Sequence, residues 1–284
     1  MARMAQGLIS ATGKQIALKD IDPGETRGMS QQETEKRLPA MQARLGELHN
    51  LLYGAAHQSL LIVLQGLDTA GKDGSVKHLM QGLNPVGCDI ASFKEPTPEE
   101  LAHDFLWRIH KRTPALGWVT IFNRSHYEDV LIVRVHELVP RAMWEERYGQ
   151  INDFERRLVE SGTIIVKFYL HISKKEQRER LLEREREPAK AWKLNVSDWK
   201  ERERWKDYRA AYEDAIRRCG TKDAPWYIVP ADKKWYRNYV LTQTLIERLE
   251  PYAKAWSAEL AERGKQTLEE IRAYHASEAP EEPE

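Results

Sequence analysis

The chain has 284 residues, of which 41% are hydrophobic and 31% charged, a composition typical of a globular protein with room for a large buried core. Lys and Arg together number 44, as do Asp and Glu, and this balance argues against a nucleic-acid partner. Two cysteines provide no disulfide framework, and the longest aliphatic run, residues 60–64, is too short to span a bilayer. We therefore expect a cytoplasmic protein without a membrane partner.

The N-terminal part of the chain predicts an arm followed by a helix. Residues 1–29 have mixed polarity and several glycines, and we expect them to be extended. Ser30 and Glu33 form a capping-box pattern, and apolar residues then recur every three or four positions up to Leu52, which predicts a helix. Pro39 lies near the start of that helix and should kink or restart it.

Five apolar runs alternate with helical patterns through the rest of the chain. The expected strands are residues 59–66, 88–93, 117–122, 163–172 and 225–231. The expected helices are residues 75–83 and 96–112 and a closing helix that ends at about residue 250. Strands that alternate with helices indicate a parallel sheet with helices on both faces, so we expect a three-layer α/β/α fold with a five-stranded parallel sheet.

The loop GLDTAGKDG, residues 66–74, follows the first strand and precedes a helix. Gly66, Gly71 and Lys72 match the phosphate-loop pattern, but Asp73 stands where that pattern has a magnesium-binding hydroxyl. Backbone N–H groups of such a loop bind anions, and the lysine follows the transferred phosphoryl group. The fold is therefore expected to be phosphate-loop kinase-like. The expected phosphate-binding residues of this region are Gly66, Ala70, Gly71, Lys72, Asp73, Gly74 and Lys77.

Two acidic side chains in a loop suited to polyanions indicate a metal ion between the protein and its substrate. Mg²⁺, with Mn²⁺ as the alternative, prefers one or two carboxylates together with water and phosphate oxygens. We expect Asp68 to be the magnesium ligand because it lies within the loop, whereas Asp73 could stabilise the helix N-terminus. The alternative is that both acids are ordinary loop and cap residues.

A second polar cluster, FNRSHYEDVLIVRVHEL over residues 122–138, follows the third strand. The guanidinium of Arg124 could bind phosphate oxygens in a bidentate manner. Glu128, one turn further on, could hold a metal ion or orient the acceptor phosphate. The expected nucleotide-binding residues are Asn123, Arg124, Glu128, Asp129 and Arg134, with Glu128 as a second metal ligand. The alternative is a strand end surrounded by surface charges.

The segment 174–218 is far more charged than the rest of the chain and lies between the fourth and fifth strands. Pro188 should end a first helix, and Ser197 or Asp198 could cap a second, which gives a helical hairpin that could close as a lid. Most of its charges should be solvated Glu–Arg pairs. Cations that arrive only on lid closure can stabilise a transferring phosphoryl group. The candidates near the break are Arg180, Arg184, Lys190 and Lys193.

These motifs resemble the family-2 polyphosphate kinases, phosphate-loop phosphotransferases that move phosphate between inorganic polyphosphate and nucleotides. The resemblance extends from about residue 30 to about residue 250 and rests on four stretches in order: GLDTAGKDG, NRSHYEDVLIVRVH, EPAKAWKLNVSDW and APWYIVPADKK. It implies that Asp68 and Lys72 act in the loop, that Arg124 binds phosphate, and that the four lid cations act on the polymer. With Glu128 added, the first three are the candidate catalytic residues.

Many members of the family have Asp and Asn where this chain has Asn123 and Glu128. The NRSHYEDV version is similar to the third class of the family, which the resemblance implies acts on both AMP and ADP. We therefore expect direct, reversible transfer of the terminal phosphate of polyphosphate to AMP and ADP, without a covalent intermediate on a residue such as His126. The alternatives are an ATP-dependent nucleoside monophosphate kinase and, in another class, a non-catalytic nucleotide-binding module. Whether Glu128 or Asn123 sets the use of AMP stays open.

The expected organisation is an arm over residues 1–29, one phosphotransferase domain over 30–255 that contains the lid, and a C-terminal helix with a disordered acidic tail over 256–284. The expected partners are inorganic polyphosphate, AMP, ADP and ATP, and further copies of the chain in a homodimer or homotetramer.

Overall fold

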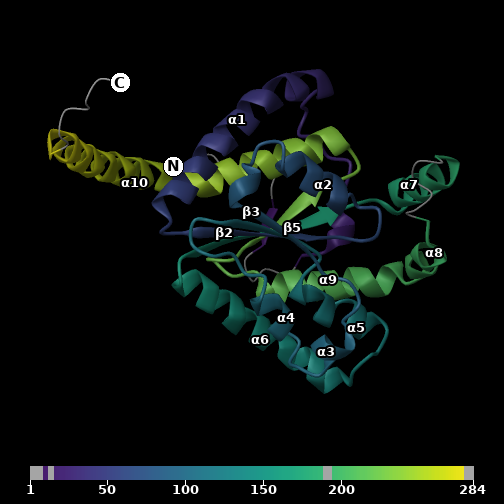
Figure 1. Ribbon diagram of the computed structural model, residues 1–284. Coiled ribbons are helices and arrows are strands. Elements are labelled where there is room, and N and C mark those ends of the chain that lie inside the picture. The colour runs from purple at the N-terminus through teal and green to yellow at the C-terminus, as the bar shows by residue number, and fades with distance from the viewer. Residues whose placement is uncertain (1–8, 12–15, 188–193, 278–284) are drawn as a thin grey trace.

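The computed structural model describes residues 9–11, 16–187 and 194–277. A six-stranded sheet in the order β1-β6-β5-β2-β4-β3 forms its centre, and helices cover both faces of the sheet (Figure 1). The strands are β1 Ile9–Ala11, β2 Ser59–Gln65, β3 Cys88–Ser92, β4 Val119–Asn123, β5 Thr163–His171 and β6 Trp226–Pro230.

The strands β2 to β6 are parallel to one another, which confirms the expected five-stranded parallel sheet. Every residue of β2 and β5 is buried, as central strands covered on both faces require. β1 pairs antiparallel with β6, so the N-terminal arm contributes an edge strand that we did not predict. A strand of three residues is too short to show a clear alternation of apolar and polar positions.

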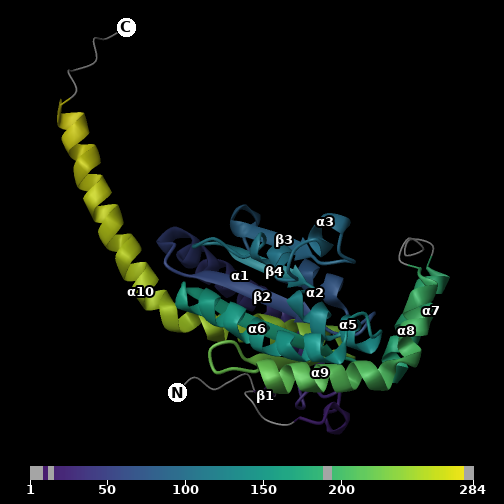
Figure 2. The same cartoon turned by 90° about the horizontal axis from the view of Figure 1, so that it is seen from below.

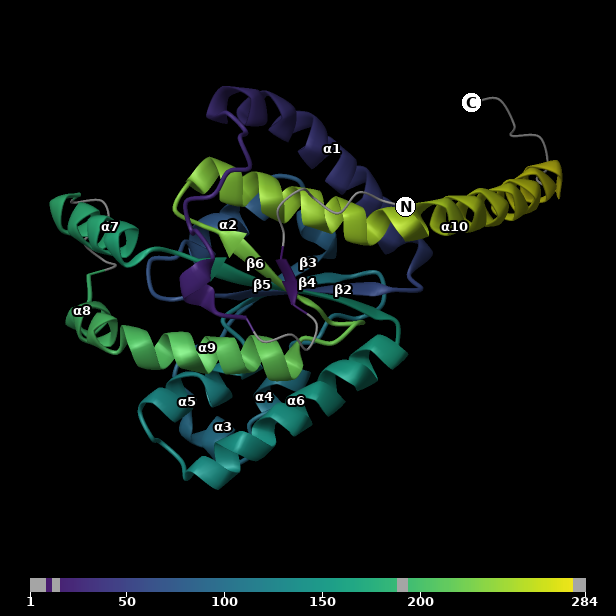
Figure 3. The ribbon, with the colours of Figure 1, turned by 180° about the vertical axis from the view of Figure 1, so that it is seen from behind.

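Helices pack on the two faces in two groups (Figure 3): α1, α2 and α10 on one face, and α4, α5, α6 and α9 on the other. The α-helices are α1 Gln31–Ala55, α2 Lys72–Leu79, α3 Pro98–Leu101, α4 Trp107–His110, α5 Ile132–Val135, α6 Arg141–Glu160, α7 Lys174–Arg186, α8 Val196–Glu203, α9 Trp205–Cys219 and α10 Lys234–Ser277. Short 3₁₀ helices in the described part of the chain cover Leu18–Asp20, Pro85–Gly87 and His126–Val130.

Two predicted helices differ from the observed ones. α1 begins as predicted, with the Ser30 hydroxyl oxygen accepting the Glu33 N–H at 3.3 Å, but it continues through Pro39 without interruption. The predicted helix over 96–112 is instead two single turns, α3 and α4. The Asp104 carboxylate accepts the backbone N–H of Leu106 at 2.9 Å, and this local turn takes the place of a continuous helical ladder.

In the described residues of 174–218 there are three helices, α7, α8 and α9, rather than a two-helix hairpin. α7 ends two residues before Pro188, as predicted. α8 is capped by Asn195 and not by Ser197 or Asp198, because the Asn195 side-chain oxygen accepts the Ser197 N–H at 3.0 Å. Figure 2 shows that α7 and α8 stand at one end of the molecule, opposite the end from which α10 extends.

α10 is longer than predicted: it continues through Pro251 to Ser277, well past residue 250 and across the domain boundary expected at residue 255. Its first part packs against α1, and the Trp256 indole N–H donates to the Gln58 side chain at 2.6 Å. The acidic tail expected to be disordered, residues 278–284, lies outside the described residues. In the part of the chain that the structure describes, no helix combines the length and apolarity needed to cross a bilayer.

Candidate functional site

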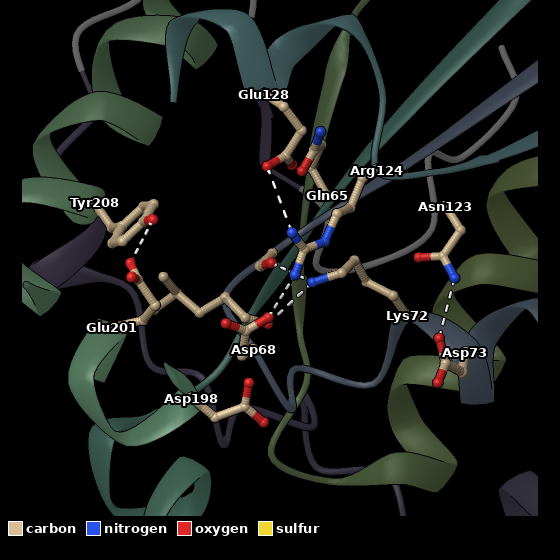
Figure 4. Close-up of polar contacts among 12 residues, drawn as sticks. Gln65, Asp68, Lys72, Asp73, Asn123, Arg124, Glu128, Asp198, Glu201 and Tyr208 are labelled. Atoms are coloured by element: carbon tan, nitrogen blue, oxygen red, sulfur yellow. Dashed lines mark hydrogen bonds and ion pairs between the residues drawn. The ribbon is translucent and has the colours of Figure 1, made fainter. Parts of the chain in front are cut away.

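The phosphate loop connects β2 to α2 at the carboxyl end of the sheet, where ligands bind in parallel α/β folds. Gly71 has a φ of 105°, a conformation that favours glycine, and it caps α2, which therefore begins at Lys72 rather than at residue 75. The Lys72 ammonium donates to the carbonyls of Gly66 at 2.6 Å and Leu67 at 3.3 Å (Figure 4). Burial, with a smaller effect of Arg124, lowers the pKa of Lys72.

Arg124 lies between two acidic side chains from different parts of the site. Its Nη2 atom donates to the Asp68 carboxylate at 2.8 Å, and its Nη1 atom lies 3.8 Å from the Glu128 carboxylate (Figure 4). Arg124 directly follows β4 and has a φ of 62°, a left-handed conformation that is strained for a residue with a side chain. The three candidate catalytic residues of this group are therefore brought together.

Asp73 and Asn123 form a second link between the loop and the end of β4. The Asn123 side-chain N–H donates to the Asp73 carboxylate at 3.0 Å. Asp73 also lies in the first turn of α2, where a carboxylate stabilises the helix N-terminus. The contact joins α2 to the end of β4, and the roles expected for Asp73 and Asp68 stay predictions.

Two adjoining cavities lie over these residues. The first lobe, about 740 Å³, is lined by the phosphate loop, the ends of β3 and β4, and the lid. The second lobe, about 330 Å³, extends from the loop to Glu128 and to the inner side of α8 and α9. Both lobes are lined by Asp68, Arg124, Asn195 and Asp198. The two lobes therefore meet at the Arg124–Asp68 ion pair.

Several lining residues were missed by the sequence analysis. Ser92, Phe93, Lys94 and Glu95 line the first lobe. Ser92 is the last residue of β3 and the other three follow it, so the rule that selects carboxyl ends of strands could have found them. The aromatic residues of α9, Tyr208 and Tyr212, line the second lobe with Trp205. Their spacing of four residues places both tyrosines on one face of the helix, but only the fold shows that this face is turned to the loop.

The second lobe is bounded by side chains that bind one another. The Tyr208 hydroxyl donates to the Glu201 carboxylate at 2.7 Å (Figure 4). The Tyr212 hydroxyl donates to the Gln65 side-chain oxygen at 3.3 Å, and the Gln65 amide donates to the Ser125 hydroxyl at 3.2 Å. Aromatic and acidic side chains thus line this lobe together.

Arg184 lines the first lobe and ties the lid together, since its Nη1 atom donates to the Asp198 carboxylate at 2.8 Å across α7 and α8. Burial and the nearby Asp68 raise the pKa of Asp198. Lys190 and Lys193, the other lid cations expected to act on the polymer, lie outside the described residues.

Arg180 occupies a different place from the one we predicted. It is buried, and all five of its N–H groups have partners. Nε donates to Glu176, Nη1 to the carbonyls of Thr69 and Ala70, and Nη2 to the carbonyls of Ala231 and Asp232. Arg180 therefore fixes the phosphate loop to the segment after β6 and does not project into the cavity.

Arg237 is a further buried cation behind the loop that the sequence analysis missed. It is 4% exposed, and its Nη1 atom donates to the Gly71 carbonyl at 3.3 Å. Burial and the neighbouring Arg180 lower the pKa of Arg237 to about 10. Two guanidinium groups thus lie under the loop, on the side away from the cavity.

Besides Arg180, four residues predicted to bind substrate do not line either lobe: Ala70, which is fully buried, Lys77, Asp129 and Arg134. Asp129 is buried and forms an ion pair with Arg147 at 3.1 Å; burial, partly offset by Arg147, raises its pKa to about 6. Arg134 forms an ion pair with Asp214 at 2.7 Å and lines a separate groove. Lys77 is exposed on α2. A sequence pattern shows which side chains are charged. It does not show whether a charged side chain on a 3₁₀ or α-helical turn points into the cavity, into the core or into solvent.

A parallel sheet, a phosphate loop at its carboxyl end, a cation between two carboxylates and a helical lid define a phosphate-loop phosphotransferase. The sequence model of the family Polyphosphate kinase 2 (PPK2) matches residues 28–256. The chain therefore belongs to the polyphosphate kinase 2 family.

Known proteins that the chain is similar to agree with this family. It is 48% identical over 238 residues to an AMP/ADP-polyphosphate phosphotransferase of Meiothermus ruber, covering 83% of this chain and 89% of that protein. It is 42% identical to an ADP-polyphosphate phosphotransferase of Rhodopseudomonas palustris, covering 80% and 82%. The crystal structure of polyphosphate kinase 2 from Arthrobacter aurescens aligns with a TM-score of 0.82 at 45% identity, over 85% of this chain and 87% of that one.

Proposed function

We propose that the chain is a polyphosphate-dependent nucleotide kinase that transfers the terminal phosphate of inorganic polyphosphate to AMP and ADP. The observation that carries the proposal is the position of Arg124, between Asp68 and Glu128 and at the junction of two lobes. Phosphoryl transfer needs a donor and an acceptor on opposite sides of the transferred group and a fixed positive charge beside it. The similarity to relatives that are named for polyphosphate and for AMP or ADP supports the choice of substrates.

The residues of the chain supply positioning and charge to this reaction. Backbone N–H groups at the start of α2 bind phosphate oxygens, and Lys72 adds a charge that can leave the loop carbonyls for the substrate. Arg124 can exchange its carboxylate partners for phosphate oxygens. Closure of α8 over the two lobes would exclude water, which otherwise competes as the acceptor.

Mg²⁺, with Mn²⁺ as the alternative, is part of the proposal. Among the residues described, no three His, Cys, Asp or Glu side chains gather as a ready metal centre. Mg²⁺ commonly takes only one or two carboxylates and completes its shell with water and phosphate. The carboxylates of Asp68 and Glu128 lie on either side of one guanidinium and fit this role. When bound, the ion would neutralise phosphate charge between the acids and the substrate.

Direct transfer without a phosphorylated protein intermediate is the mechanism we propose. His126 is the candidate for a covalent intermediate, but its side chain is fully buried. Its Nε2 atom lies 3.2 Å from the Glu155 carboxylate, and burial lowers its pKa. It does not line either lobe. A nucleophile in that position would have no access to a phosphate chain.

The test is an assay with AMP or ADP, Mg²⁺ and either long-chain polyphosphate or ATP as the donor. We expect ADP and ATP from AMP, and ATP from ADP, with polyphosphate as donor. Formation of ADP from AMP with ATP alone would instead identify a nucleoside monophosphate kinase. Binding of nucleotide without turnover by either donor would identify a non-catalytic module. A phosphohistidine that forms and decays at the rate of turnover would overturn direct transfer.

We propose in addition that the protein forms a homodimer or homotetramer and acts in the cytoplasm. The outer part of α10 carries the exposed apolar side chains Leu268, Ile271 and Tyr274 along one side of the helix. Such a stripe is unfavourable in water and suits a second copy of the chain. Light scattering on the purified protein, with Leu268→Glu and Ile271→Glu as variants, tests the association. The unpaired cysteines Cys88 and Cys219 fit a reducing compartment.

A further inference from the structure

A network of buried polar groups lies behind the Arg124–Glu128 segment, and Nδ1 of His126 is its one buried atom without a hydrogen-bond partner among the described residues. Lys167, on β5, and Glu155, on α6, are 0% and 2% exposed, and their side chains contact each other at 2.5 Å. The Lys167 ammonium also donates to the Tyr127 hydroxyl at 2.8 Å and to the Cys219 carbonyl at 2.6 Å. Its three N–H groups therefore have three acceptors.

The other half of the network connects Glu155 to His126 and Tyr127, which lie between Arg124 and Glu128 in the sequence. The Tyr127 hydroxyl donates to Oε1 of Glu155 at 2.8 Å, and Nε2 of His126 lies 3.2 Å from the same oxygen. The attraction of Lys167 and the contact with His126 outweigh burial and lower the pKa of Glu155. Glu155 is therefore a buried anion that faces an ammonium, a phenol and an imidazole.

The two residues that enter this network lie between the two that enter the cavity. His126 and Tyr127 point into the core, whereas Arg124 and Glu128 face the second lobe. The segment begins with the strained left-handed φ of Arg124 and continues as a single 3₁₀ turn. Short 3₁₀ turns have poor hydrogen-bond geometry and few internal contacts. The anchorage of the turn must come from its neighbours.

We propose that the Lys167–Glu155–Tyr127 network is a positioning device for Arg124 and Glu128. Burying an ion pair costs desolvation and gives no reliable gain in stability over apolar packing. In this protein the network fixes the orientation of the 3₁₀ turn, because the hydrogen bonds of Tyr127 and His126 prevent the turn from rotating about its axis. Rotation of that turn would displace both side chains that meet the transferred phosphate. This inference rests on the proposed function for its kinetic consequence but not for its structural one.

The first experiment compares Tyr127→Phe with Ser59→Ala. Tyr127→Phe deletes one hydroxyl that donates to Glu155 and accepts from Lys167. Ser59→Ala also deletes one buried hydroxyl hydrogen bond, to Thr163 at 3.0 Å, but it lies where β2 and β5 begin, at the far end of the sheet from the loop. Hydrogen–deuterium exchange followed by mass spectrometry reports the opening of residues 124–130 in each variant. We expect at least tenfold faster exchange in that segment for Tyr127→Phe alone.

The second experiment measures turnover in the same variants. We expect Tyr127→Phe to lower kcat about tenfold and to change the KM of either substrate less than twofold. Ser59→Ala should keep the kcat of the unmodified protein. If Tyr127 acts through Arg124 and Glu128, its substitution in a background that already carries Arg124→Lys and Glu128→Gln should cost less than twofold, since both groups it positions are already replaced.

The outcomes separate the inference from the proposed function. Unchanged exchange of residues 124–130 in Tyr127→Phe, or equal acceleration in Ser59→Ala, would overturn the positioning role whatever the enzyme catalyses. A full tenfold loss in the background that carries both Arg124→Lys and Glu128→Gln would also contradict it and indicate a general loss of folded protein. Faster exchange in Tyr127→Phe, together with no use of polyphosphate by the unmodified protein, would instead leave the network standing and refute the substrate assignment.

Discussion

The guanidinium of Arg124 and the carboxylate of Asp68 form an ion pair at 2.8 Å that joins the end of β4 to the loop after β2. The pair lies at the junction of the two lobes, so any ligand that spans both must pass it. A phosphate group would compete with Asp68 for the guanidinium. A cation would compete with the guanidinium for Asp68. The pair is thus a single contact through which an anionic substrate and the proposed metal ion would influence each other.

The first prediction concerns Asp68. In Asp68→Asn the amide keeps the size of the side chain but loses the charge that would hold Mg²⁺. We expect turnover to fall at limiting magnesium and to recover in part at high magnesium, with little change in thermal stability. Titration of activity against magnesium measures this. Activity equal to that of the unmodified protein at limiting magnesium would exclude a metal-anchoring role for Asp68.

The second prediction concerns Lys72. Its ammonium rests on the carbonyls of Gly66 and Leu67, and a phosphate chain in the loop would offer it stronger acceptors. Lys72→Ala should lower kcat on the order of a hundredfold or more, because a charge beside the transferring group is lost. Lys254→Ala, on the exposed side of α10, is the matched removal of a lysine and should have no effect. A loss below threefold in Lys72→Ala would show that the backbone alone binds the phosphates.

The third prediction concerns the lid. Arg184 is partly exposed, binds Asp198 and lines the first lobe, whereas Arg178 on the same helix is exposed and lies beside Glu179. Arg184→Gln should lower turnover or polyphosphate affinity several-fold with a change in Tm near zero, since partly exposed ion pairs contribute about 0 to 1 kcal/mol. Arg178→Gln should change neither. The affinity of the unmodified protein for polyphosphate should weaken as salt rises, and a salt-independent affinity would contradict a cationic path.

Much of this site could be predicted because its parts lie at strand ends. Continuous apolar runs located β2, β4 and β5, and the residues directly after the first two strands are the loop and Arg124. The rest depended on contacts between distant segments. Arg180 is charged like its lid neighbours. Only the fold shows that its N–H groups donate to backbone carbonyls and to Glu176. The burial of Asp129 against Arg147 is likewise invisible in a pattern of charges.

The fourth prediction concerns pH. His78 lies on α2 and is 6% exposed, with Nε2 2.8 Å from the Thr242 hydroxyl of α10. Burial and the nearby Arg237 lower its pKa from 6.5 to about 4. The folded state therefore binds fewer protons than the unfolded state between these two values, and stability is fully present above pH 6.5 and lost as pH falls toward 4. The loss attributable to His78 is roughly 3 kcal/mol.

Denaturant unfolding at pH 7 and pH 4.5 tests this. We expect His78→Gln to reduce the difference in free energy of unfolding between the two pH values. The same substitution at His103, which is exposed, should leave that difference unchanged. An identical pH dependence in His78→Gln and the unmodified protein would assign the acid sensitivity to other groups.

The last prediction concerns Glu128, whose carboxylate lies 3.8 Å from Arg124 and lines the second lobe. Asn123 is neutral, so the end of β4 lacks its usual anion, and Glu128 restores a negative charge one turn further on. AMP must place its α-phosphate where ADP presents its β-phosphate, which carries the shorter nucleotide deeper into the site. It should therefore depend more on a group that holds a metal ion or orients the acceptor there. We expect Glu128→Asn to lower the ratio of AMP to ADP activity severalfold.

The control for this prediction comes from the same lobe. The Glu201 carboxylate lines it too but is held by Tyr208 at 2.7 Å and lies 2.9 Å from Nε2 of His136. Glu201→Gln should loosen the lid and lower activity with both nucleotides by the same factor. Initial rates with each nucleotide at saturating polyphosphate give the two ratios. Equal losses with AMP and ADP in Glu128→Asn would make Glu128 a general catalytic residue, and no loss with either would place it outside the reaction. Both outcomes contradict the prediction, because removing a carboxylate that orients the shorter acceptor must change the ratio of AMP to ADP activity.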